Sequence, residues 1–183
     1  MKLAVVVGHN ARAQGAIRQD TGETEWSWNS KLAMRIYDLA PAAIDVKVFF
    51  RNPVIRSYTK EIQDVYRRSD EWGADATVEL HFNSHHNPDA TGTETLSSGS
   101  RMSLAYAGAL QEHMLDALGL KDRGEKIVRT GRGSASLISG KAPAALIEPF
   151  FGSSPEGLAA TDEGREVDAL ARAILAATED VFL

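Results

Sequence analysis

Residues 3–9 read Leu3-Ala4-Val5-Val6-Val7-Gly8-His9, and this stretch gives the first indication of the fold. Five consecutive apolar residues that end at a glycine indicate a strand buried on both faces, as strands of a parallel sheet are. The run is too short for the ~7–15 apolar residues of a signal-peptide core. We therefore expect a buried first strand, in a chain that is synthesised in the cytoplasm without a signal peptide.

The rest of the chain alternates apolar runs of strand length with segments of helical period. This alternation predicts a single α/β domain over residues 1–183, with a mostly parallel or mixed sheet of about six strands and helices on both faces. A loop is expected over 131–140, which is rich in Gly and Ser. Strands are expected at 3–7, 46–50, 76–82, 91–96 and 144–147, and helices at 28–39, 58–72, 106–118 and from 167 to the C-terminus.

The composition limits both the partners and the metal chemistry of the chain. A net charge of −5 argues against sequence-independent binding to nucleic acid or to an anionic membrane, both of which require a basic patch. No stretch approaches the ~18 apolar residues of a membrane span. The chain has no cysteine, so a metal ion would have to be held by His and carboxylate side chains.

Three polar residues lie at the ends of expected strands: His9, His81 and Glu148. The carboxyl ends of strands in open α/β sheets are where ligands bind, so these side chains are expected to meet at one edge. Two His and a carboxylate are a common zinc ligand set, although a single His after a strand is more often structural. Glu148 stands between apolar segments, and a buried carboxylate there favours a cation partner or a catalytic role.

Five short motifs follow one another in chain order: Val7-Gly8-His9-Asn10, Glu25-Trp26-Ser27-Trp28-Asn29, Glu79-Leu80-His81-Phe82-Asn83-Ser84, Thr91-Gly92-Thr93-Glu94 and Ala145-Leu146-Ile147-Glu148-Pro149-Phe150. Together they resemble the motifs of the zinc-dependent N-acetylmuramoyl-L-alanine amidases of bacteria and phages. The chain departs from the family at Val6 and Asn10, where an Asp and a second Gly are usual.

The resemblance implies a phosphorylase/hydrolase-like fold and one Zn²⁺ per chain, held by His9, Glu25 and His81. Glu148 would be the general acid/base of a hydrolysis that uses a metal-activated water. The bond cut would be the amide between N-acetylmuramic acid and L-alanine in peptidoglycan. Further expected substrate contacts are Asn83, His85, His86 and Glu94.

Some assignments remain open at this point. Glu23 is an alternative to Glu25 as ligand, and Asn29, four residues after Glu25 as in the family, favours Glu25. His85 and His86 could equally form an exposed polar loop. His113 lies on the apolar side of a helix and is expected to be structural.

Two other functions are compatible with the pattern. One is a related zinc amidohydrolase that acts on a small N-acyl amino acid, similar to an N-formylglutamate deformylase. The other is a catalytically dead peptidoglycan-binding module, suggested by the departures around His9. For the amidase, the lack of a signal peptide and of a separate wall-binding domain suggests an endolysin. It would need a holin-type or other export partner to reach the periplasmic or extracellular cell wall.

Overall fold

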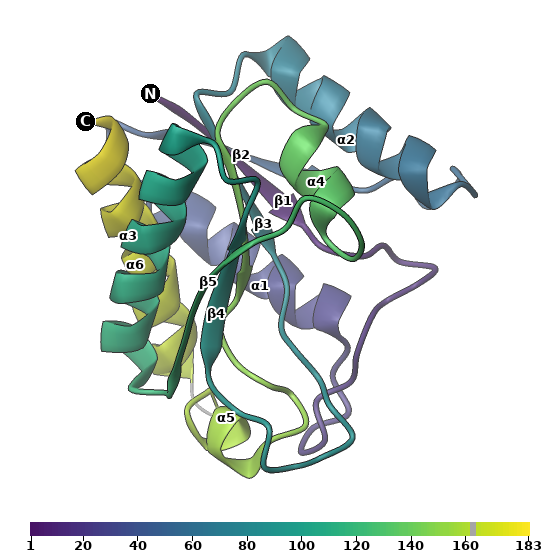
Figure 1. The fold of residues 1–183 in the computed structure, drawn as a ribbon, viewed down its shortest axis with the longest axis vertical. Coiled ribbons are helices and arrows are strands. Elements are labelled where there is room, and N and C mark those ends of the chain that lie inside the picture. Colours follow the sequence, from purple (N-terminus) through teal and green to yellow (C-terminus); the bar gives the residue numbers. More distant parts are fainter. Residues whose placement is uncertain (162–163) are drawn as a thin grey trace.

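The computed structural model describes residues 1–161 and 164–183 as one α/β domain built on a six-stranded sheet (Figure 1). The strands are β1 (Lys2–Val7), β2 (Asp45–Phe50), β3 (Ala76–Leu80), β4 (Thr93–Ser97), β5 (Asp122–Ile127) and β6 (Ala144–Glu148). The helices are α1 (Glu25–Leu39), α2 (Tyr58–Trp72), α3 (Arg101–Leu118), α4 (Ser134–Ile138), α5 (Pro155–Ala159) and α6 (Gly164–Phe182).

The sheet is mixed, in the order β2-β1-β3-β6-β4-β5. The first four strands in this order are mutually parallel, β4 is antiparallel to β6, and β5 is parallel to β4. The carboxyl ends of β1, β3 and β6 therefore lie together at one edge of the sheet. The expected α/β class, with about six strands in a mostly parallel or mixed sheet, is confirmed.

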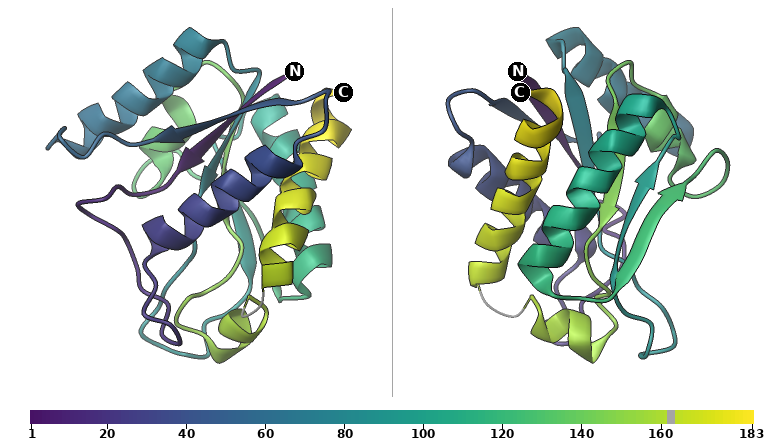
Figure 2. Two further views of the ribbon diagram at one scale, coloured as in Figure 1. Left: turned by 180° about the vertical axis from the view of Figure 1, so that it is seen from behind. Right: turned by 60° about the vertical axis from the view of Figure 1, so that its left-hand side comes forward.

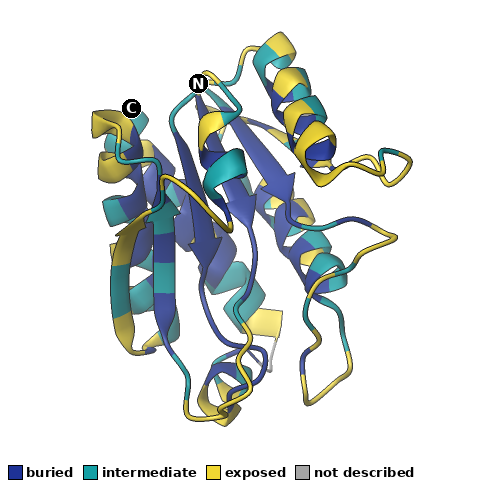
Figure 3. Cartoon of the chain, turned by 45° about the vertical axis from the view of Figure 1, so that its right-hand side comes forward, coloured by how far each residue is buried: buried dark blue, intermediate teal, exposed yellow. Residues whose placement is uncertain are grey.

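Helices cover both faces of the sheet and enclose two apolar cores. Helices α1, α3 and α6 pack on one face, and α3 and α6 lie side by side along it (Figure 2). Helix α2 packs on the other face, with α4 beside it. The side chains of β1 point alternately into the two cores: Val5 and Val7 pack in the core with α1, whereas Ala4 and Val6 pack in the core with α2. The central strands β1, β3 and β6 are thus buried on both faces (Figure 3).

Local sequence signals set the helix boundaries that matter for the site. Thr24 caps α1 by accepting a hydrogen bond from the Ser27 backbone, so that Glu25 becomes the first helical residue. Ser57 and Ser100 cap α2 and α3 in the same way. Among the described residues, no helix is both long enough and apolar enough to span a membrane.

Several expected boundaries were wrong. Residues 131–140 are not all loop, because α4 forms there and buries Leu137 on the sheet. Strand β5 was missed because it is a polar, largely exposed edge strand without an apolar pattern. The third strand ends at Leu80, before His81, and the Leu80 carbonyl accepts a hydrogen bond from the N–H of Gly8, the residue after β1 (3.0 Å).

Candidate metal centre and active site

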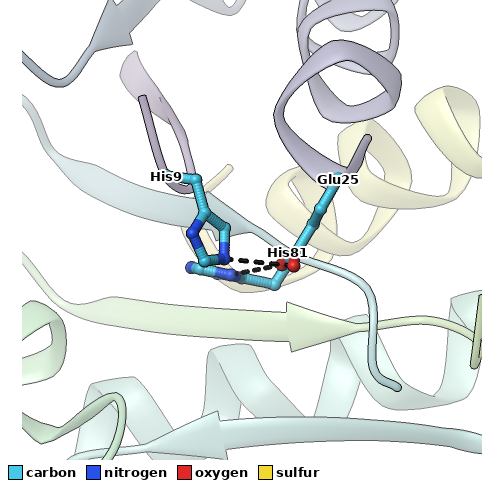
Figure 4. Close-up of side chains that lie close together, drawn as sticks. All are labelled: His9, Glu25 and His81. Carbon is cyan, nitrogen blue, oxygen red and sulfur yellow. Dashed lines mark hydrogen bonds and ion pairs between the residues drawn. The ribbon is translucent and has the colours of Figure 1, made fainter. Parts of the chain in front are cut away.

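Three separate segments bring His9, Glu25 and His81 together (Figure 4). His9 follows β1 after a single residue, Gly8, and His81 directly follows β3. Because β1 and β3 are parallel neighbours, the two His leave the sheet side by side. Glu25 reaches them from the first turn of α1. The expected convergence of strand-end residues is therefore observed for both His.

The carboxylate of Glu25 lies between the two imidazoles. Its Oε1 is 2.7 Å from His81 Nδ1, and its Oε2 is 3.0 Å from His9 Nε2. Burial would raise the pKa of Glu25, but interactions with His81 and then His9 outweigh it and lower that pKa. Ligand atoms from the three residues lie within 4.8 Å of one another, and no other such group of His and carboxylates occurs within residues 1–161 and 164–183.

The donor set fits a cation such as zinc. Two imidazole nitrogens and one carboxylate leave a fourth tetrahedral position open, as catalytic zinc sites require. His9 Nε2 is buried, and its 3.0 Å contact with Glu25 Oε2 lacks the geometry of a hydrogen bond, so its lone pair can serve a metal ion. Gly15 packs against the same two side chains and leaves space for them, because a Cβ at Gly15 would lie 2.5 Å from Glu25 Oε2 and 2.7 Å from His9 Nε2.

This close approach makes Gly15→Ala a specific test of the metal site. The added methyl group would press on two of the three ligands, so we expect loss of metal binding. Gly22→Ala is the matched control, because Gly22 has a similar φ of +75°, against +79° for Gly15, but a Cβ at Gly22 would meet no described atom within 4 Å. Both changes should cost about 1–2 kcal/mol of backbone strain. Equal metal content in the two purified variants would contradict the assignment.

The loop after β1 is organised by Asn10, one of the two residues that depart from the family motif. His9 adopts a left-handed backbone, with φ of 63°. The Asn10 side-chain oxygen accepts from the backbone N–H groups of Arg12 and Ala13, and its amide donates to Glu61 of α2 (2.7 Å). Asn10 therefore ties the His9 loop to α2.

Glu23 does not lie at the candidate metal centre. Its carboxylate forms an ion pair with Lys31 (2.7 Å) and accepts a hydrogen bond from the Ser27 hydroxyl (2.8 Å), both of which belong to α1. The geometry therefore favours Glu25, the side chain that contacts both His.

We expect Glu25→Ala to abolish stoichiometric metal binding, because it removes the carboxylate between the two imidazoles. Glu23→Ala should retain the metal and lose only its surface contacts. Metal analysis of the two purified variants decides between them, and the opposite order would move the ligand to Glu23.

Glu148 ends β6 and faces a cavity of about 610 Å³ that His9 and His81 also line. Its side chain is buried, and its Oε2 has no hydrogen-bond partner. Burial raises the pKa of Glu148 to about 7, although the positive charge of His81 opposes the shift. A carboxyl group with this pKa can both accept and donate a proton near neutral pH.

The raised pKa of Glu148 should be visible in the stability of the metal-free chain. The folded state binds this proton more tightly than the unfolded state, so the stabilising contribution is complete below pH 4.5 and is lost as the pH rises through 7. Relative to Glu148→Gln, wild type should lose roughly 2–3 kcal/mol between about pH 5 and about pH 8. Urea unfolding of both metal-free proteins measures this, and parallel pH profiles would contradict it.

The other expected substrate contacts divide into two groups. Asn83 and Glu94 line the cavity, and Glu94 is held by Asn83 and Arg123 at 2.9 Å each. His85 and His86 are exposed, stack on each other at 4.1 Å between ring centroids, and do not line the cavity, so their contact with substrate stays a prediction.

His113, expected to be structural, is half-buried on α3. It pairs with Asp180 of α6 at 2.8 Å.

Sequence reasoning missed several residues of this region. Arg51, Tyr58 and Arg132 all line the cavity, and Glu79 lies fully buried beside His81. Arg51 and Tyr58 come from the loop between β2 and α2 and from the start of α2, which carry no motif. Glu79 had a detectable signal, because it is the only charged residue of an otherwise uncharged buried strand.

The fold and the site together define an α/β protein with a two-His, one-Glu candidate metal centre at the carboxyl edge of its sheet. The sequence matches the N-acetylmuramoyl-L-alanine amidase family over residues 3–180. The chain therefore belongs to this family, and it is an amidase. Comparison with curated proteins finds no sequence match.

Solved structures of amidase catalytic domains share the fold over nearly their whole length. The CwlV catalytic domain from Bacillus (Paenibacillus) polymyxa var. colistinus is 24% identical, with a TM-score of 0.82 and 99% of both chains covered. The catalytic domain of the CD27L endolysin, which targets Clostridia difficile, is 24% identical, with a TM-score of 0.84 and coverage of 100% of this chain and 99% of that one. AmiC2 of Nostoc punctiforme is 20% identical, with a TM-score of 0.80 and coverage of 97% and 95%.

Proposed function

We propose that the chain is a zinc-dependent hydrolase of the amide bond between N-acetylmuramic acid and L-alanine in peptidoglycan. The observation that carries this proposal is the arrangement of His9, Glu25 and His81 beside Glu148 at one cavity. The family match supports the bond type. The donor set of two imidazoles and a carboxylate, in a chain without cysteine, supports zinc.

In the proposed mechanism, His9 Nε2, Glu25 and His81 would hold the ion, which when bound would supply Lewis acidity for acidifying water and polarising a carbonyl group. Glu148 accepts a proton from the attacking water and then donates it to the leaving amine of L-alanine. Its burial and its unpartnered Oε2 leave the carboxylate free for this exchange.

The substrate assignment is tested by comparing two candidate substrates. Zinc-loaded protein should release soluble peptide from purified sacculi and leave N-formyl-L-glutamate intact. Hydrolysis of N-formyl-L-glutamate alone would favour the small-molecule amidohydrolase. Zinc binding and sacculus binding without release of peptide would favour the inactive binding module.

Peptidoglycan lies outside the cytoplasmic membrane, so we also propose that chains released in the cytoplasm reach it through a separate holin-type or other export partner. Expression in a bacterial host with and without a co-expressed holin tests this. Equal lysis in the two cultures would exclude the need for such a partner.

A further inference from the structure

A buried polar network lies behind His81, on the side away from Glu25. Glu79 lies two residues before His81, so both side chains leave the chain on the same face of the sheet. Glu79 Oε1 contacts His81 Nε2 at 2.9 Å and also accepts from the Arg51 guanidinium. Its Oε2 accepts from the Tyr66 hydroxyl of α2 at 2.7 Å. Both carboxylate oxygens are therefore engaged.

Stability alone does not account for this network. Glu79 is completely buried and Arg51 is 5% exposed, so both charges have been removed from water. The cost of removing a buried ion pair from water often cancels the attraction, and apolar side chains of similar size can be as stabilising. We therefore expect the buried carboxylate of Glu79 to act on the imidazole of His81, which it contacts.

The two ring nitrogens of His81 face different carboxylates. Nδ1 faces Glu25 at the metal centre, and Nε2 faces Glu79. A His that binds a metal ion through one nitrogen commonly donates the N–H of the other to a carboxylate, which fixes the tautomer and the ring orientation. Gly8 leaves the space that the imidazole ring occupies, because a Cβ at Gly8 would lie only 2.6 Å from His81 Nε2.

We propose that Glu79, held in place by Arg51 and Tyr66, is the positioning residue that presents His81 to the metal ion through Nδ1. Glu79 accepts a hydrogen bond from the Nε2–H group of His81, so the lone pair of Nδ1 points to the metal centre. Arg51 balances the charge of Glu79, and Tyr66 fixes the second oxygen of its carboxylate. This inference rests on the proposed metal site and adds residues that act through His81.

The test compares zinc affinities, measured by competition with a chelating indicator, together with melting temperatures. Glu79→Gln alone would leave the Arg51 guanidinium buried without its partner, so the main variant is Arg51→Met combined with Glu79→Gln. Tyr66→Phe removes one hydrogen bond to Glu79 and keeps both charges. Tyr106→Phe is its matched control, because Tyr106 is equally buried and its hydroxyl bonds Thr178 (2.9 Å) in the core formed with α3 and α6.

We expect the double variant to bind zinc about 10–100-fold more weakly than wild type. Tyr66→Phe should weaken binding less, but in the same direction. Tyr106→Phe should leave zinc affinity unchanged, even if it lowers the melting temperature as much as Tyr66→Phe does.

The outcomes separate this inference from the proposed function. Wild-type zinc affinity in the folded double variant would overturn the positioning role of Glu79 and leave the proposed metal site standing. If the double variant does not fold, Tyr66→Phe decides, and an affinity equal to that of Tyr106→Phe overturns it. A wild-type chain that binds no zinc would overturn the proposed metal site, and this inference with it.

Discussion

Replacement of Glu148 with glutamine is expected to slow hydrolysis of sacculi by about 10²–10⁴-fold, the usual loss when a general acid–base residue is removed. Glutamine keeps the size of the side chain but cannot accept the proton of water. Zinc content should not change, because Glu148 is not one of the three residues that converge on the metal centre. Release of peptide from sacculi by equal amounts of zinc-loaded protein measures the effect.

Glu94→Gln is the matched control for this experiment. Glu94 lies directly opposite Glu148 on the neighbouring strand and lines the same cavity, but both of its oxygens already accept hydrogen bonds. We expect it to lower activity less. Loss of zinc in Glu148→Gln would make Glu148 a ligand, whereas normal activity with normal zinc would assign the proton transfer to another group.

The second large effect is expected from His9→Ala and His81→Ala. Either change removes one of two nitrogen ligands and leaves Glu25 facing a single imidazole, so the purified variants should lose stoichiometric zinc and, with it, detectable hydrolysis. The physical reason is that a catalytic zinc site needs three protein ligands. Metal analysis of each variant, with sacculus hydrolysis alongside, provides the measurement.

The remaining His residues serve as controls for non-specific metal loss. His113→Ala removes a contact to Asp180 outside the cavity, and the double change of His85 and His86 removes an exposed pair. All of these proteins should keep their zinc. Zinc retained by His9→Ala or His81→Ala, or lost from the double variant, would show that the ligands have been assigned incorrectly.

The sequence allowed the architecture to be predicted where burial leaves a pattern. The apolar runs that became β1, β3 and β6 are buried on both faces, and their alternation with helical segments indicated a mostly parallel or mixed sheet. The rule that ligands bind at the carboxyl ends of strands in open α/β sheets placed His9, His81 and Glu148 at one edge. In contrast, β5 lies at the edge of the sheet with exposed Lys126 and Ile127, and α4 begins after Gly133, so neither carries a periodic signal.

The candidate site was only partly accessible from the sequence. Glu25 comes from a helix start and not from a strand end, so only the family resemblance, with Asn29 four residues later, distinguished it from Glu23. The contacts of Glu79 with Arg51 and Tyr66 join β3 to the residue after β2 and to α2. Such contacts depend on the three-dimensional packing of α2 against the sheet, which no local motif encodes.

We propose that this chain uses a zinc site to cut the bond between N-acetylmuramic acid and L-alanine. Mass spectrometry of sacculi digested with zinc-loaded wild-type protein tests it most directly, with Glu148→Gln as the blank. The expected products are stem peptides with a free L-alanine amino terminus and glycan strands whose lactyl groups are unsubstituted. Peptides that begin at another residue, or glycan fragments with newly formed reducing ends, would contradict the claim.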